Sequence, residues 1–167
     1  MGSGGHRPPL QQMMIQPRLR RLERLFFSSP VYFITFCTKD RKRILDNQEI
    51  HQSFVEFSMN ASAKRFFVGQ YLVMRDHVHF FLSVNTESNS LSVWMKSMKN
   101  FLSKQLRRQG IPPTHWQKGF FDHVMRTEES YSEKWNYVIL NPVRAGLSKS
   151  PGDWLYQGEI NPIRFSE

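Results

Sequence analysis

The stretch YLVMRDHVHFFLSV, residues 71–84, decides the fold that we expect for this chain of 167 residues. Apolar and β-branched residues fill its two halves, and such residues favour strands. Arg75 and Asp76 stand between the halves, where a tight turn belongs. The stretch therefore predicts a β-hairpin whose second strand runs over residues 77–84.

The two faces of this second strand differ, because successive side chains of a strand point to opposite sides of the sheet. One face is entirely apolar and is expected to be buried; it consists of Val78, Phe80, Leu82 and Val84. The other face carries His77 and His79, about 6 to 7 Å apart along the strand. At that spacing both imidazoles can reach one metal ion. The same pair is also compatible with ordinary polarity on a half-exposed strand, so catalysis requires a third ligand and a reactive group from another element.

Length and composition indicate one globular domain. A chain of 167 residues can form one sizeable core, and a hydrophobic share of 40% with 14% aromatic residues excludes wholesale disorder. We expect a flexible basic N-terminal arm over residues 1–27, the folded domain over residues 28–147 and a C-terminal extension over residues 148–167.

Charge and cysteine content indicate the setting and the partner. The net charge of +9 points to a polyanion, with nucleic acid as the first candidate. The basic residues are spread over several segments and no apolar run approaches the roughly 20 residues of a membrane span, so no membrane partner is expected. The single cysteine, Cys37, cannot form an internal disulfide. We therefore expect a cytoplasmic, nucleoid-associated protein.

Hydrophobic periodicity predicts further elements around the hairpin. In chain order we expect a strand at 31–39, a helix at 47–65, the hairpin at 66–84, a helix at 91–109, a strand at 120–126 and a helix at 128–140. All but the last match an α+β fold, the ferredoxin-like βαββαβ unit, whose antiparallel sheet has two helices on one face. The extra C-terminal helix can then cover the opposite face, where the two histidines lie.

This last helix offers the groups that the histidine pair lacks. Tyr137 and Asn141 are four positions apart and stack on one side of a helix, which Pro142 should end or kink at Asn141. A carboxamide oxygen suits a hard divalent cation and completes a three-ligand site with the two imidazoles. Attack by the Tyr137 phenol on a metal-polarised phosphate would give a covalent phosphotyrosine. The alternative, a rim tyrosine and a C-cap asparagine, stays open.

Basic residues concentrate in an arm at 18–24, a loop at 39–43 and one side of the helix at 91–109. Phosphate contacts are a reasonable role for such clusters, although a run of charge is also typical of a solvated surface. The candidate DNA-binding residues are Arg18, Arg20, Arg21, Arg24, Lys39, Arg41, Lys42, Arg43, Lys96, Lys99, Lys104, Arg107, Arg126 and Arg144.

Four stretches of the chain resemble the HUH single-tyrosine transposases, and most closely the REP-associated tyrosine transposases. They are YFITFCTKDRKRIL, VMRDHVHFFLSV, HWQKGFFDHVMR and NYVILNPVRAGL, and together they run from Tyr32 to Leu147. The HVH triplet alone is a weak signal. Its combination with the Y-x-x-x-N-P-V-R-A-G-L run is quite specific.

The resemblance implies a metal-dependent nickase-ligase for single-stranded DNA that leaves a 5′-phosphotyrosine and a free 3′-hydroxyl. His77 and His79 match the family's two catalytic histidines, which bind Mg²⁺ or Mn²⁺, while Tyr137 matches its nucleophile and Asn141 its third metal ligand. The family's DNA is a repetitive extragenic palindrome, abbreviated REP, so single-stranded DNA with a hairpin is the implied partner. Related enzymes include monomers and homodimers, and the oligomeric state stays open.

Two other functions are compatible with these features. The ferredoxin-like topology also occurs in RNA-binding modules, so a non-catalytic binder of single-stranded nucleic-acid hairpins is one alternative. Such modules usually display two or three aromatic side chains on their central strands, where this chain has His77 and His79. The other alternative is a domesticated protein that keeps the cleavage chemistry in the service of its host.

Overall fold

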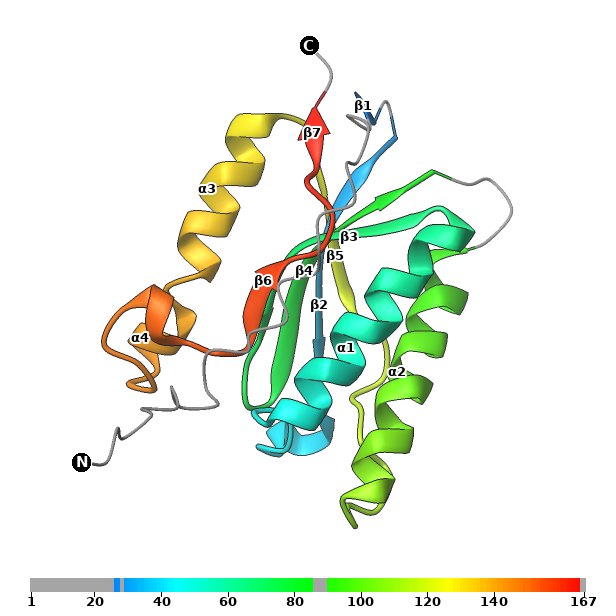
Figure 1. Ribbon diagram of the computed structural model, residues 1–167, viewed down its shortest axis with the longest axis vertical. Helices are drawn as coiled ribbons and strands as arrows, with labels where there is room; N and C mark the ends of the chain where they lie inside the picture. The colour runs from blue at the N-terminus through cyan, green and yellow to red at the C-terminus, as the bar shows by residue number, and fades with distance from the viewer. Residues whose placement is uncertain (1–25, 28, 86–89, 166–167) are drawn as a thin grey trace, which may run out of the picture.

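A five-stranded antiparallel sheet with the order β5-β2-β4-β3-β6 forms the centre of the computed structural model (Figure 1). Its strands are β2 (Val31–Cys37), β3 (Phe66–Val73), β4 (His77–Val84), β5 (Phe121–Met125) and β6 (Gln157–Glu159). The structure describes residues 26–27, 29–85 and 90–165. Strands β2 to β5 have the order of a ferredoxin-like unit, so the predicted fold class is confirmed.

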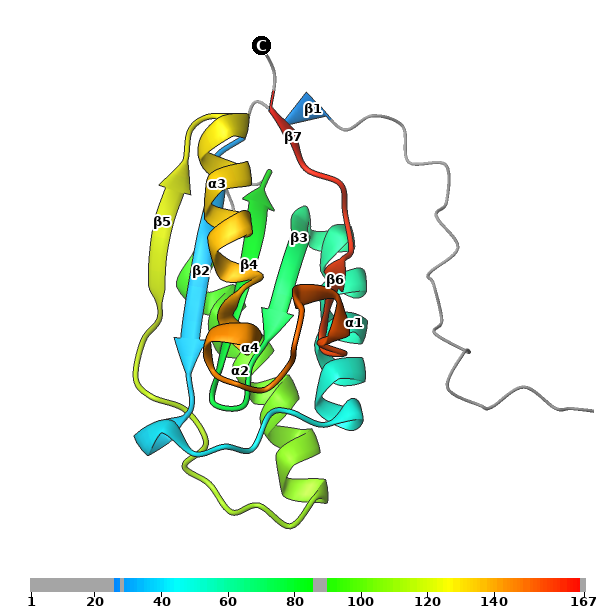
Figure 2. The ribbon, with the colours of Figure 1, turned by 90° about the vertical axis from the view of Figure 1, so that its left-hand side faces the viewer.

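Helices cover both faces of this sheet. Helices α1 (Gln48–Ala61) and α2 (Leu91–Arg108) lie side by side on one face, and α3 (Glu128–Val138) lies on the other (Figures 1 and 2). Each helix begins at a polar side chain that accepts a hydrogen bond from the first turn, which is why these sequences start helices where they do. The three N-cap residues are Asn47, Ser90 and Thr127. None of the helices within the described residues has the length and apolar character that crossing a membrane requires.

Strand β4 lies at the middle of the sheet and divides the core into two parts. Val78, Phe80 and Leu82 are fully buried in the larger part, beneath α1 and α2, as the alternation of the sequence predicts. Phe81 points the opposite way and is buried in the smaller part, beneath α3. The Tyr131 ring of α3 packs on Phe81 with 3.9 Å between ring centroids, and this contact seats the helix on the sheet.

The last helix ends earlier than the sequence pattern predicts. Helix α3 stops at Val138, two residues before the predicted end at residue 140, and a separate short helix, α4 (Asn141–Arg144), follows. Pro142 lies in the first turn of α4, where its missing N–H costs nothing. Tyr137 and Asn141 therefore belong to two consecutive helices and not to one continuous face.

The segment after α4 adds short elements that hydrophobic periodicity does not predict. Strand β6 pairs with the edge of β3, and the indole Nε1 of Trp154 donates to the carbonyl of Val73 at 2.9 Å. Ile163 is buried in the smaller part of the core. The remaining elements are β1 (Phe26–Phe27), which pairs in parallel with β7 (Arg164–Phe165), and the 3₁₀ turns η2 (Lys39–Arg41), η3 (Ser62–Lys64) and η4 (Pro151–Asp153).

Candidate active site

His77 and His79 stand side by side on β4, on the face that α3 covers. Their ring centroids are 4.7 Å apart and the ring planes are nearly perpendicular, at 80°. Strand β2 runs alongside, so Cys37 lies opposite His77 and Thr35 lies opposite His79 in the register. The two imidazoles are therefore close enough to act on one ligand, as the sequence predicts.

The Nδ1 atom of each ring is already hydrogen-bonded. Nδ1 of His77 lies 2.6 Å from Oδ1 of Asp76, and Nδ1 of His79 lies 2.7 Å from Oγ1 of Thr35. A carboxylate accepts and cannot donate, so Nδ1 of His77 carries the proton. Within the described part of the chain, neither Nε2 atom has a hydrogen-bond partner.

Burial keeps both imidazoles in the neutral form that can bind a metal. Burial lowers the pKa of His79 to about 3, and the positive charges of Arg41, Lys134 and Arg144 and the neighbouring His77 act in the same direction. Burial also lowers the pKa of His77, against the opposing effect of its hydrogen bond to Asp76. At neutral pH the pair therefore presents uncharged nitrogen donors.

Helices α3 and α4 lie on one side of the sheet (Figure 2), and side chains from both act on this pair. Nζ of Lys134 lies 5.3 Å from the centre of the Phe33 ring, and Phe33 stacks on His79 with 5.4 Å between centroids. The charge of Arg144 also reaches His79. The covering of the histidine face by the last helical segment is thus observed.

Tyr137 and Asn141 lie on this covering layer, one on each helix. Tyr137 is 64% exposed near the end of α3, and Asn141 is half-buried at the start of α4. Arg144 donates hydrogen bonds to the carbonyl oxygen of Tyr137, at 2.8 Å, and to Oδ1 of Asn141. Oδ1 of Asn141 is thus held by a guanidinium, and the roles of nucleophile and third ligand stay predictions.

The donors of the site fit a divalent cation of the Mn²⁺ kind. Two neutral imidazoles with unpaired Nε2 atoms can supply nitrogen ligands, and a carboxamide in the covering layer can supply an oxygen. No group of three or more His, Cys, Asp and Glu side chains that could hold a metal ion occurs among residues 26–27, 29–85 and 90–165. A metal at His77 and His79 would therefore depend on Asn141, on water or on substrate oxygens for its remaining ligands.

The predicted phosphate-binding residues have different surroundings. Exposed side chains among them include Lys39, Lys42, Arg43, Lys96, Lys104, Arg107 and Arg126. Lys99 is half-buried and donates to the carbonyls of Gln117 and Gly119, at 3.1 and 2.5 Å. Arg18, Arg20, Arg21 and Arg24 lie outside the described residues.

Asp76, Thr35 and Arg41 also lie at the site. The sequence predicts no site role for Asp76 or Thr35, and for Arg41 it predicts only a contact with phosphate. Nε of Arg41 lies 3.0 Å from Oδ2 of Asp76, beside the histidines. These partners could have been inferred from their positions, because Asp76 directly precedes His77 and strand pairing places a β2 residue opposite each histidine. A third histidine, His115, is buried and bonds Ser103 and the Ile111 carbonyl, at 2.9 Å each, so its place is structural.

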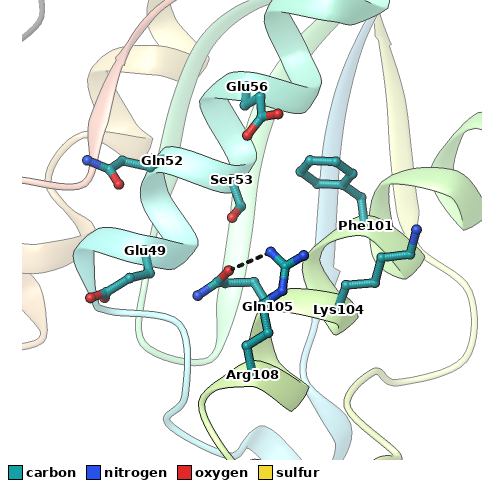
Figure 3. Close-up of a pocket in the computed structure, with 8 residues that line it drawn as sticks. All are labelled: Glu49, Gln52, Ser53, Glu56, Phe101, Lys104, Gln105 and Arg108. Carbon is teal, nitrogen blue, oxygen red and sulfur yellow. Dashed lines mark hydrogen bonds between the residues drawn. The ribbon is translucent and has the colours of Figure 1, made fainter.

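A hollow lies between α1 and α2 (Figure 3), the two helices on the face of the sheet opposite α3. Acidic Glu49 and Glu56 line it from α1, and basic Lys104 and Arg108 line it from α2. The hollow contributes nothing to the histidine site.

Comparisons with known proteins agree with this fold. The family model described as "Transposase IS200 like" matches residues 27–138. A REP-associated tyrosine transposase of Escherichia coli (strain K12) is 20% identical over 134 residues, covering 78% of this chain and 77% of that protein. A Haemophilus influenzae relative assigned to the same group is 21% identical over 145 residues, covering 78% and 80%.

A solved structure of a REP-associated tyrosine transposase bound to a REP hairpin has the same fold. Its TM-score is 0.63 at 20% identity, and the match covers 81% of this chain and 79% of that one. The model of the IS200-like family covers more than half of the chain, so the chain belongs to the IS200-like transposases. It is thereby placed among enzymes of the tyrosine-transposase class.

Proposed function

We propose that this protein is a metal-dependent endonuclease and strand transferase for single-stranded DNA that works through a 5′-phosphotyrosine. The observation that carries the proposal is the placement of two neutral, adjacent imidazoles beneath a helix that presents Tyr137. Family membership supports the class of enzyme. His77, His79 and Asn141 would hold Mg²⁺ or Mn²⁺, which supplies Lewis-acid polarisation of phosphate oxygens when bound.

The proposed cleavage needs no nucleotide cofactor. Oη of Tyr137 attacks the scissile phosphorus, and a new bond forms between that oxygen and phosphorus as the phenol proton is lost. The bond from phosphorus to the 3′ oxygen breaks, and this oxygen leaves as a 3′-hydroxyl after taking up a proton. The 5′-phosphate stays on Tyr137. A second 3′-hydroxyl can reverse the step, so cleavage and rejoining use the same groups.

We propose that the DNA partner carries a palindromic hairpin of the REP kind. The solved relative of the same fold is bound to a REP hairpin. Exposed Lys96, Lys104 and Arg107 on α2, and the basic loop at 39–43, offer positive charge for a phosphate backbone. A non-catalytic or domesticated hairpin binder would use the same cations, so chemistry is what separates the two functions.

The decisive experiment compares two tyrosines of one helix. Wild type, Tyr137→Phe and Tyr131→Phe are incubated with single-stranded DNA carrying a palindromic hairpin from the source genome, with Mn²⁺ or with EDTA. We expect wild type and Tyr131→Phe to give a cut strand and a covalent adduct on denaturing gels, only with Mn²⁺. Tyr137→Phe should give neither product. If wild type and both variants bind the hairpin but none forms an adduct, the proposed cleavage is wrong and the protein is a non-catalytic hairpin binder.

A further inference from the structure

We infer that Asp76 is a positioning residue for the proposed metal site, because it fixes which nitrogen of His77 is free to bind. The inference rests on the proposed function, since it assumes that His77 and His79 hold the cation. Asp76 occupies the turn between β3 and β4, one residue before His77. It does not itself have to touch the metal.

Both oxygens of the Asp76 carboxylate are committed. Oδ1 lies 2.6 Å from Nδ1 of His77, and Oδ2 lies 3.0 Å from Nε of Arg41. The Asp76 side chain is 21% exposed and that of His77 is 15% exposed, so water competes little for this pair. A carboxylate whose two oxygens are both bonded is fixed in one orientation. Its bond to Nδ1 then fixes the orientation of the His77 ring.

The second contact of this ring, with Arg41, does not change the tautomer. Nη2 of Arg41 lies 3.4 Å from Nδ1 of His77, but a guanidinium only donates. A protonated Nδ1 cannot accept from it, so the shorter bond to Asp76 decides where the proton is. The lone pair of the neutral ring is then on Nε2. Metal-bound histidines characteristically donate their other N–H to a carboxylate, which fixes the ring and raises its basicity.

The backbone around Arg41 is built to keep the guanidinium in place. Asp40 and Arg41 both have left-handed backbone angles, with φ of 54° and 55°, which residues with a side chain rarely adopt. The turn is tied down on both sides, because the N–H of Thr38 donates to the Asp76 carbonyl at 2.9 Å and the N–H of Ile44 donates to the Arg75 carbonyl at 2.9 Å. A strained turn anchored at both ends therefore presents Arg41 to Asp76.

The test uses the full chain and three variants. Asp76→Ala removes the acceptor, and Asp76→Asn keeps an acceptor oxygen without the charge. Asp46→Asn is the matched control, because Asp46 pairs with Arg75 at 3.2 Å without contacting either histidine. The first readout is the tautomer of His77 in metal-free protein, from long-range ¹H–¹⁵N correlation spectra. The second readout is the dissociation constant for Mn²⁺, from calorimetry or electron paramagnetic resonance.

We expect wild type and Asp46→Asn to show Nδ1–H at His77 and the same Mn²⁺ affinity. Asp76→Ala should show a mixture of tautomers and an Mn²⁺ dissociation constant about 10- to 100-fold higher, the range for such outer partners. Asp76→Asn should fall between them. Should Asp76→Ala fail to fold, Asp76→Asn alone decides.

An unchanged tautomer and an unchanged Mn²⁺ affinity in the Asp76 variants would overturn the inference, as would wild type that binds no Mn²⁺. These measurements need no DNA. A wild type that binds Mn²⁺ with the expected Asp76 dependence, yet forms no adduct with hairpin DNA, would leave the inference standing and refute the proposed cleavage. The two failures are therefore distinguishable.

Discussion

The guanidinium of Arg144 lies over the ring of Tyr137, with its central carbon 4.1 Å from the ring centre. Nη2 of the same side chain donates to the Tyr137 carbonyl and to Oδ1 of Asn141. One cation thus joins the end of α3 to the start of α4, across the break that Pro142 introduces. The contact couples the proposed nucleophile to the proposed third ligand.

We predict that Arg144→Ala slows adduct formation about tenfold, with a smaller loss of hairpin affinity. A cation over an exposed aromatic ring contributes about 0.5–1 kcal/mol, and the variant also loses the hydrogen bonds that hold Asn141. Rates of adduct formation are measured at saturating DNA. Lys149→Ala, an exposed cation beyond α4, is the control and should keep the wild-type rate. A faster rate in Arg144→Ala would show instead that Arg144 withholds Asn141 from the metal.

Metal binding should appear as thermal stabilisation. At a Mn²⁺ concentration 100 times its dissociation constant, a ligand that binds only the folded state adds about 2.7 kcal/mol, which corresponds to several degrees in Tm. His79→Ala should remove this increase. His51→Ala is the control, since His51 bonds Tyr71 at 2.8 Å far from the pair on β4 and should keep the increase. An increase that persists in His79→Ala would place the metal elsewhere.

Two lysines of α2 are expected to have different roles, one in DNA binding and one in the stability of the fold. Lys96 is exposed, so Lys96→Gln should reduce the slope of log affinity against log salt by about 0.7–0.9, as for one lost phosphate contact. Lys99 donates to the carbonyls of Gln117 and Gly119. Lys99→Gln should therefore lower the free energy of unfolding and leave the salt dependence of DNA affinity nearly unchanged. Hairpin affinity at several salt concentrations and urea unfolding of both variants check this. Equal slopes in wild type and Lys96→Gln would remove Lys96 from the interface.

Stability at alkaline pH should depend on Tyr71. Burial raises the pKa of this phenol to about 12, whereas the unfolded chain ionises near 10. The phenol's contribution is fully present below pH 10 and is lost as the pH rises towards 12, up to about 2 kcal/mol.

Urea unfolding of wild type and Tyr71→Phe at pH 9 and pH 11 tests that loss. At pH 9 the variant should be less stable by about 1 kcal/mol, because it lacks the hydrogen bond to His51. At pH 11 the difference should shrink, since Phe has no proton to lose. Parallel behaviour at the two pH values would contradict the expected ionisation.

The hairpin at the centre of the sheet could be predicted because its signal is local and repeated. Alternation along β4 separates Val78 and Phe80 from His77 and His79, and burial in the structure follows that separation. Caps such as Thr127 mark helix starts equally well, because a single side chain forms the bond. These features need no knowledge of distant residues.

The network around the histidines depends on distant residues and escaped prediction. Arg41 reaches Asp76 only because an unusual backbone at Asp40 and Arg41 turns the chain, and no periodic pattern encodes such angles. Strand β6 is three residues long, too short for alternation to show. The boundary predicted between residues 147 and 148 stays a prediction, although β6 and Ile163 pack against the domain.

The position of Ile163 has a consequence for the order of synthesis. An added Cβ at Gly69 of β3 would lie 2.6 Å from Ile163 Cδ1 and 3.1 Å from the Tyr131 hydroxyl, so the late segment and α3 meet over the same backbone. A ribosome releases α3, with Tyr137, before it releases Ile163. An unfinished chain therefore displays the tyrosine on a helix without its complete seat. We expect the proposed DNA-cutting competence to arise only after residue 163 has left the exit tunnel.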